Sequence, residues 1–209
     1  MASPLSGAAR WLALGDSYTV GEGVAGSERW PERVAERLRS GGAAWTPPRV
    51  LAATGWITDE LLAAMARERV WPVTERFALV SLMVGVNDQY RGGDAETYRP
   101  RFAALLAKAI TFAGGDARRV IVLSIPDWGA SPFAEGRDRA RIAAEIDRFN
   151  AVNREETERL GARYVDITPG SRKAGASFST DGLHPSGDAY EEWAQVALAE
   201  AMVALEGQK

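Results

Sequence analysis

Cysteine is absent from this chain of 209 residues, and histidine occurs once, at position 184. The absence of cysteine excludes disulfides, a redox dithiol, a thiol nucleophile and thiolate metal sites. A single histidine also excludes the zinc sites that need several imidazoles, which leaves only hard cations held by carboxylates. Any step that requires an imidazole must therefore use His184.

Excess positive charge and long hydrophobic runs are also lacking. The chain has 25 basic and 28 acidic side chains, and a net charge of −3 gives no electrostatic reason to expect nucleic acid as a partner. The longest apolar run, residues 77–86, is too short to cross a bilayer, and residues 1–10 lack the apolar stretch of a signal peptide. We expect a cytoplasmic protein without stable membrane insertion, with a single domain over residues 1–209.

Short apolar runs alternate with segments of helical period along the whole chain. This alternation is typical of a parallel sheet that helices cover on both faces, with right-handed crossovers. We therefore predict the α/β class, as one three-layer αβα domain with a five-stranded parallel sheet. The predicted strands are residues 11–14, 49–53, 77–84, 120–125 and 163–167.

Five longer helices are predicted between and after these strands. Apolar spacing and capping residues place them at 31–38, 58–70, 95–113, 135–160 and from Ser186 onward. Gly41 and Gly161 are expected to end the first and fourth of them. On the last helix, the predicted inner face is Tyr190, Trp193, Ala197, Met202 and Leu205.

Polar residues stand in the loops where such a fold binds its ligands, beyond the carboxyl ends of the strands. Taken singly, each loop is explained by turns or helix caps. Together they supply a serine, a histidine with an acid three residues before it, and donors for an oxyanion. The four blocks are Gly15-Asp16-Ser17-Tyr18, Thr54-Gly55-Trp56, Gly85-Val86-Asn87-Asp88 and Asp181-Gly182-Leu183-His184-Pro185.

In this order and spacing, the blocks resemble those of the SGNH hydrolases, also called the GDSL esterases and lipases. That family is named for a Ser, a Gly, an Asn and a His, which here match Ser17, Gly55, Asn87 and His184. The resemblance implies a flavodoxin-like fold and an oxyanion hole made by the backbone N–H groups of Ser17 and Gly55 with the Asn87 side chain. The sequence departs from the family name at Tyr18, where the name has Leu, which bears on subgroup and specificity.

Acyl transfer gives the remaining roles a chemical reason. A serine hydroxyl needs a base within hydrogen-bond reach, and His184 is the only imidazole; the unperturbed pKa of histidine, near 6.5, suits that role. Asp181 would orient the imidazole and stabilise its charged form. Asp16 competes for this role, but it adjoins Ser17 and neighbouring side chains point apart, so we favour Asp181. No metal or organic cofactor is required.

A second motif favours another reaction class. Gly21, Gly23 and Gly26 match the fingerprint G-x-G-x-x-G, so a nucleotide-binding oxidoreductase is an alternative. However, the motif begins seven residues after the strand that ends at Leu14, and Glu22 would lie beside a pyrophosphate. We interpret these glycines as a flexible active-site loop. The chain also lacks the G-x-S-x-G elbow of the α/β-hydrolases.

The sequence thus predicts a serine esterase that hydrolyses carboxylic or thio esters through an acyl-enzyme on Ser17. An acyltransferase, a lysophospholipase or a thioesterase could use the same site, and these alternatives stay open. The expected partner is a small acyl ester. Aromatic residues in the loops are the candidates for binding it, namely Trp56, Tyr90, Trp128 and Phe133.

Overall fold

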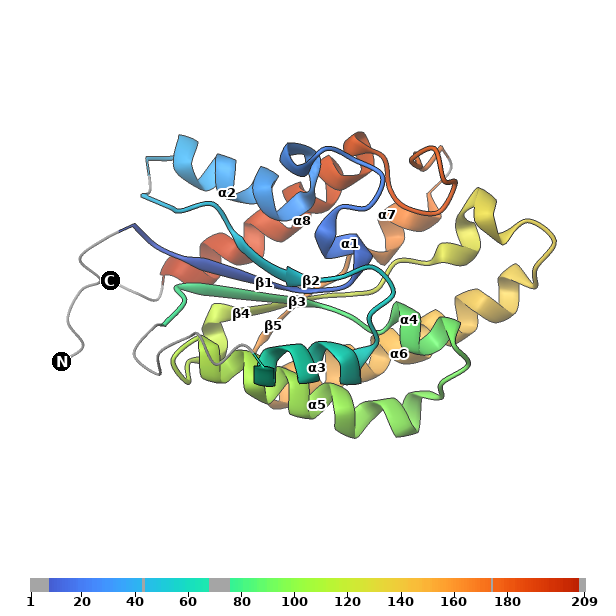
Figure 1. Ribbon diagram of the computed structural model, residues 1–209, viewed down its shortest axis with the longest axis horizontal. Coiled ribbons are helices and arrows are strands. Elements are labelled where there is room, and N and C mark those ends of the chain that lie inside the picture. Colours follow the sequence, from blue (N-terminus) through green and yellow to red (C-terminus); the bar gives the residue numbers. More distant parts are fainter. Residues whose placement is uncertain (1–7, 43, 68–75, 174, 207–209) are drawn as a thin grey trace.

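A parallel β-sheet runs through the middle of the molecule, between two layers of helices (Figure 1). The computed structural model describes residues 8–42, 44–67, 76–173 and 175–206. The sheet has the strand order β2-β1-β3-β4-β5, and every neighbouring pair is parallel. The strands are β1 (Trp11–Gly15), β2 (Arg49–Ala52), β3 (Leu79–Met83), β4 (Val120–Leu123) and β5 (Arg163–Val165). The predicted α/β fold with a five-stranded parallel sheet is confirmed.

The two helical layers bury both faces of the sheet. Helices α2 (Trp30–Ser40) and α8 (Gly187–Glu206) cover one face, and α3 (Thr58–Arg67), α5 (Ala95–Phe112) and α6 (Arg139–Arg159) cover the other (Figure 1). Every residue of β1, β3 and β4 is buried, which explains their nearly continuous apolar sequences.

Short helical turns that periodicity did not predict occupy the connections. These turns are the α-helices α1 (Ser17–Val20), α4 (Val86–Tyr90) and α7 (Thr168–Arg172) and the 3₁₀ turns η1 (Gly26–Glu28), η2 (Ala117–Arg119), η3 (Trp128–Ala130) and η4 (Pro132–Ala134). The three α-helical turns follow β1, β3 and β5 after one or two residues, so they lie at the carboxyl edge of the sheet. Single turns are too short to show an apolar period, so only the structure reveals them.

The predicted strand ends differ from the observed ones by one or two residues. In the segment 120–125 the ladder ends at Leu123, although Ile125 is fully buried. The backbone N–H of Ile125 donates to Asn150 Oδ1 (2.8 Å), and its carbonyl accepts from Asn150 Nδ2 (3.0 Å). A side-chain amide from α6 therefore replaces the strand partner at this position.

Two predictions about helices were wrong. The helix predicted from residue 135 begins at Arg139, because Gly136 has a φ of +73° and Asp138 caps the first turn. On α8, Met202 is 49% exposed, whereas Leu205, also predicted for the inner face, is partly buried and packs against the core. The buried stripe continues instead through Ala201 and Ala204. Met202 follows Ala197 by five residues, which places it about 140° around the helix from the buried face.

The other helix ends agree closely with the prediction. The predicted helix 58–70 is observed to Arg67, and residues 68–70 lie outside the described part of the chain. Gly41 caps α2, Gly161 follows α6 with a φ of +77°, and Ser186 Oγ accepts from the N–H of Ala189 at the start of α8. Among the described residues, no helix is both long enough and apolar enough to cross a membrane.

Candidate active site

The strand order creates a topological switch point between β1 and β3, because the chain leaves these two neighbouring strands in opposite directions along the sheet. In open α/β sheets, ligands bind at such a point, beyond the carboxyl ends of the strands. Ser17 begins α1, with only Asp16 between it and β1, and Asn87 lies in α4, which follows β3. The loop before α8 carries Asp181 and His184 to the same place, where Ser17 and His184 are hydrogen-bonded.

A continuous chain of hydrogen bonds joins the three residues that were assigned to acyl transfer. Ser17 Oγ lies 2.9 Å from His184 Nε2, and His184 Nδ1 lies 2.6 Å from Asp181 Oδ2. A carboxylate can only accept, so Nδ1 carries the proton and Nε2 is free to accept from the serine hydroxyl. Ser17 and His184 are both buried among their neighbours, although they line a pocket.

Asp181 is held in place by three further donors. Its second oxygen, Oδ1, accepts from Ser179 Oγ (2.8 Å) and from the backbone N–H groups of Leu183 (2.8 Å) and His184 (2.9 Å). Partial burial acts to raise the pKa of Asp181. The hydrogen bonds from His184, Leu183 and Ser179 outweigh that effect and lower the pKa well below its ordinary value. The carboxylate therefore stays ionised beside the imidazole.

The competing acid, Asp16, has a different role in the structure. Its Oδ1 accepts from the backbone N–H of Tyr18 (3.1 Å) and so caps α1, while Oδ2 is buried with no hydrogen-bond partner. Burial raises the pKa of Asp16 to about 7; the bond from Tyr18 opposes this shift and the nearby Asp88 adds to it. Asp16 thus shapes the turn that presents Ser17, and it is Asp181 that contacts the imidazole.

The second and third blocks are fastened to each other. Asn87 Nδ2 donates to the carbonyl of Trp56 (3.0 Å), while both the N–H and the hydroxyl of Thr58 donate to Asp88 Oδ2 (3.0 Å each). Gly55 has a φ of +81°, and a Cβ atom there would make only an ordinary contact with Arg91 Nη2 at 3.8 Å, so backbone conformation is the reason for glycine here. These contacts fix the Asn87 amide next to the turn that contains Gly55.

A pocket of about 170 Å³ opens over Ser17 and His184. Three of the four predicted aromatic residues line it, and these are Tyr90, Trp128 and Phe133. Trp56 does not belong to the lining, because its ring is partly buried against the core and its carbonyl serves Asn87. The lining also includes four residues that the sequence did not single out as substrate contacts: Tyr18, Thr54, Val86 and Leu183.

Tyr18, the departure from the family name, packs against the histidine. The centroids of the Tyr18 and His184 rings are 5.1 Å apart, and Tyr18 also contacts Trp193 at 5.9 Å. Burial, reinforced by the nearby Asp16, raises the pKa of Tyr18 above its ordinary value, so the phenol stays neutral. The Tyr18 ring packs against the imidazole at an interplanar angle of 54°, a contact that the sequence motif did not predict.

Tyr90, Trp128 and Phe133 form an aromatic wall of the pocket, which polar contacts hold in place. Trp128 Nε1 donates to Gln89 Oε1 (2.7 Å), and Gln89 Nε2 donates to Glu145 Oε2 (2.8 Å) on α6. The backbone N–H of Phe133 donates to the carbonyl of Gly182 (2.9 Å), which ties this wall to the loop of Asp181 and His184.

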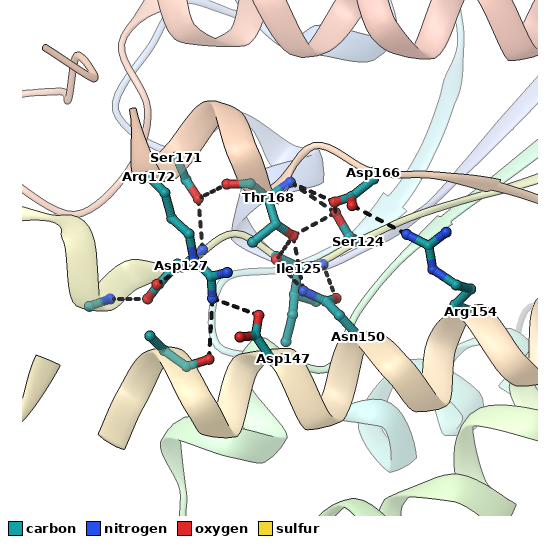
Figure 2. A network of polar contacts seen from close by, with 12 residues as sticks. Ser124, Ile125, Asp127, Asp147, Asn150, Arg154, Asp166, Thr168, Ser171 and Arg172 are labelled. Carbon is teal, nitrogen blue, oxygen red and sulfur yellow. Dashed lines mark hydrogen bonds and ion pairs between the residues drawn. The ribbon is translucent and has the colours of Figure 1, made fainter. Parts of the chain in front are cut away.

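Figure 2 shows the polar network around Asp127, the residue just before Trp128. Asp127 Oδ2 accepts from Arg172 Nε (2.8 Å), and Arg172 Nη2 forms an ion pair with Asp147 of α6 (2.8 Å). The backbone N–H of Asp127 donates to Ser171 Oγ (2.9 Å). Asp127 is nearly completely buried, so α6 and α7 together fix the residue that precedes Trp128.

The glycines of the alternative motif do not form a dinucleotide site. Gly21 ends α1 in the left-handed conformation, with a φ of +80°, whereas the fingerprint needs a glycine loop that begins a helix. Gly23 packs so closely on Ser179 that a Cβ atom would lie 2.4 Å from its hydroxyl. Glu22 accepts a hydrogen bond from Thr54 of the pocket. The loop of residues 21–26 therefore packs against the outside of the site, at Ser179 and Thr54.

Flavodoxin-like topology and a Ser–His–Asp chain at the switch point are features of a family of acyl hydrolases. The family model described as "GDSL-like Lipase/Acylhydrolase family" matches residues 13–192. The chain belongs to the GDSL-like lipase/acylhydrolase family, and in general terms it is a hydrolase that acts on ester bonds. The resemblance seen in the four sequence blocks is confirmed. Curated protein sequences give no match to the chain.

Solved structures share the fold over nearly the whole chain. TesA is 22% identical, with a TM-score of 0.70 over 96% of this chain and 99% of its own. A putative GDSL-like lipase from Parabacteroides merdae is 19% identical, with a TM-score of 0.72 over 96% and 98%. A variant of Axe2, an acetyl-xylooligosaccharide esterase from Geobacillus Stearmophilus, is 20% identical, with a TM-score of 0.69 over 93% and 95%.

Proposed function

We propose that this protein is a serine esterase that hydrolyses carboxylic esters through a covalent acyl-enzyme on Ser17. One observation carries the proposal: Ser17 Oγ, both ring nitrogens of His184 and the Asp181 carboxylate form one hydrogen-bonded chain at the floor of a pocket. This arrangement activates a hydroxyl that is otherwise a weak nucleophile at neutral pH.

The reaction proceeds in two acyl-transfer steps. Ser17 Oγ attacks the ester carbonyl carbon while its proton passes to His184 Nε2. The tetrahedral intermediate then collapses, the bond to the alcohol oxygen breaks, and His184 returns the proton to that oxygen. In the second step, water attacks the acyl-enzyme and gives its proton to His184. The bond to Ser17 Oγ breaks, Ser17 recovers the proton, and the acid leaves.

Three donors are available for the oxyanion. The N–H of Ser17 lies in the first turn of α1, where an amide has no acceptor within the helix. The second donor is the N–H of Gly55. The third is one N–H of the Asn87 side-chain amide, because the other N–H of that amide already donates to the carbonyl of Trp56. Asp181 stays ionised and compensates the positive charge that His184 gains in each step.

The size of the pocket favours short acyl groups. Its volume of about 170 Å³ lies below the range of about 300–1,000 Å³ that is usual for drug-sized ligands. An acetyl group, which the related Axe2 removes from xylooligosaccharides according to its name, is of this kind. A thioesterase, a lysophospholipase or an acyltransferase would use the same acyl-enzyme. An acyltransferase differs only in that an alcohol, instead of water, takes the acyl group.

Hydrolysis of p-nitrophenyl esters of increasing chain length tests the proposal. We expect the acetate or butyrate to be the best substrate, and we expect Ser17→Ala and His184→Ala to lower kcat by about 10⁴-fold or more. Melting temperatures of both variants control for folding. If His184→Ala, with its fold intact, turned over esters at a rate near that of the wild type, the mechanism would be wrong, because the chain has no second histidine.

A further inference from the structure

An arginine lies on the aromatic wall of the pocket. The guanidinium carbon of Arg137 is 5.6 Å from the ring centroid of Tyr90, 5.3 Å from that of Trp128 and 5.2 Å from that of Phe133. The same three rings line the pocket above Ser17 and contact one another, with centroids 5.2 to 6.4 Å apart. One cation is thus shared by all three rings that bound the candidate substrate site.

In the described part of the chain, the guanidinium of Arg137 keeps its hydrogen-bond donors free. Among the described residues, its side chain forms no hydrogen bond or ion pair, whereas nearby arginines do. Arg139 Nη1 donates to the carbonyl of Gly129 (2.6 Å), and Arg141 pairs with Glu145 (2.8 Å). The adjacent carboxylate, Asp138, accepts from the backbone N–H of Arg141 to cap α6. Cation–π contacts hold a guanidinium by its face and leave the N–H groups at its edge free.

The surroundings make this cation effective. Apart from His184, the described residues that line the pocket have no titratable side chain other than the phenols of Tyr18 and Tyr90, so no lining carboxylate competes for Arg137. The Arg137 side chain is exposed, and on one side it packs on Trp128, which is almost fully buried and forms a low-dielectric backing for the charge. A positive charge beside apolar surface attracts an anion more strongly than the same charge surrounded by water.

We propose that Arg137 determines specificity by binding a carboxylate or phosphate that the ester substrate carries, and that the natural substrates are therefore anionic esters. This inference rests on the proposed esterase function and names its substrate class. A guanidinium recognises either anion through two parallel N–H···O bonds. The anion can belong to the acyl part or to the alcohol part of the ester, and the two arms of the experiment below distinguish these sources.

The test compares anionic esters with neutral esters of nearly the same shape. In the acyl arm, monoethyl succinate is paired with ethyl 4-methylpentanoate, in which an isopropyl group replaces the carboxylate. In the alcohol arm, 4-carboxyphenyl acetate is paired with 4-isopropylphenyl acetate. Acid release is followed by pH-stat titration for all four esters, so no chromogenic group biases the comparison. The measured quantity is the ratio of kcat/KM for the anionic ester to that for its neutral partner.

We expect Arg137→Gln to lower this ratio by about 10-fold in one arm, through a higher KM for the anionic ester. Arg137→Lys keeps the charge but loses the paired donors, so it should recover part of the ratio. The matched control is Lys108→Gln, which also removes a cation lying over a ring, here Phe112 at 5.6 Å on the exposed side of α5. Lys108→Gln should leave the ratio unchanged. In the wild type, 0.5 M salt should lower the ratio, because salt screens the charge of Arg137.

The outcomes separate this inference from the proposed function. If the wild type hydrolyses the neutral esters but the ratios are the same in wild type and Arg137→Gln, Arg137 does not select substrates and the inference is overturned. An equal loss on anionic and neutral esters would also overturn it, since Arg137 would then only support the aromatic wall. If no ester is hydrolysed in a manner that depends on Ser17, the proposed function itself fails.

Discussion

Replacement of Asp181 by asparagine separates the charge of this residue from its structural contacts. Asp181 Oδ1 accepts three hydrogen bonds from the loop, and Asp181 Oδ2 accepts one from His184 Nδ1 at 2.6 Å. Asparagine retains one oxygen for the three loop donors. Its NH₂ group then faces Nδ1, which must become an acceptor, and the ring proton moves to Nε2. In that tautomer His184 cannot accept the proton of Ser17.

The expected loss in kcat is on the order of 10⁴-fold, the size seen when a triad acid is replaced by its amide. At 1.36 kcal/mol for each factor of ten, this corresponds to about 5.4 kcal/mol of transition-state stabilisation. The melting temperature should change little, because the three loop contacts persist. Initial rates on p-nitrophenyl acetate, together with thermal unfolding, measure both quantities.

Ser179→Ala is the matched control for this prediction. It removes the hydroxyl that donates to Asp181 Oδ1 (2.8 Å) and leaves the contact with the imidazole in place. We expect its kcat to stay within about tenfold of the wild type, as for the loss of one hydrogen bond. A folded Asp181→Asn variant that retained more than a tenth of the wild-type kcat would refute the assigned role of Asp181.

Two further predictions concern the oxyanion and the buried acid. Asn87→Ala should lower kcat by about 100- to 1,000-fold with a smaller change in KM; an unchanged kcat on p-nitrophenyl acetate would remove Asn87 from the oxyanion hole. The pKa of Asp16 is raised from 3.8 to about 7, so between these pH values the native state holds a proton that the unfolded chain has lost, and stability falls as the pH rises. Asp16→Asn keeps the acceptor for the N–H of Tyr18. It should make the free energy of unfolding fall less with rising pH, by about 4 kcal/mol at most. Urea unfolding at pH 4.5 and 7.5 measures it, and identical pH dependence in both proteins would contradict the burial argument.

Residues whose environment is set locally were predictable. Buried strands and long amphipathic helices have a period, and caps such as Ser186 or end glycines such as Gly161 act within one turn, so their positions followed from the sequence. The start of α6 and the exposure of Met202 were not, because they depend on the geometry of one loop and on the packing of α8. At the site, the positions of the Trp56 and Tyr18 rings could not be predicted from the sequence either. A ring beside a motif residue can face the pocket or the core, and only packing decides which.

The sequence by itself determined the chemistry that is available: an oxygen nucleophile, since there is no cysteine, and one imidazole, at position 184. It also determined the fold class, because alternating buried strands and helices have few compact arrangements. The tertiary structure decided which acid contacts His184 and which aromatic rings form the pocket. It also placed Arg137, which belongs to none of the four sequence blocks, over those rings. The pocket and the contact of Arg137 with Tyr90 join segments far apart in the chain, which meet only once the sheet has brought the loops together. The contact of Asp181 with His184 depends instead on the conformation of a single loop.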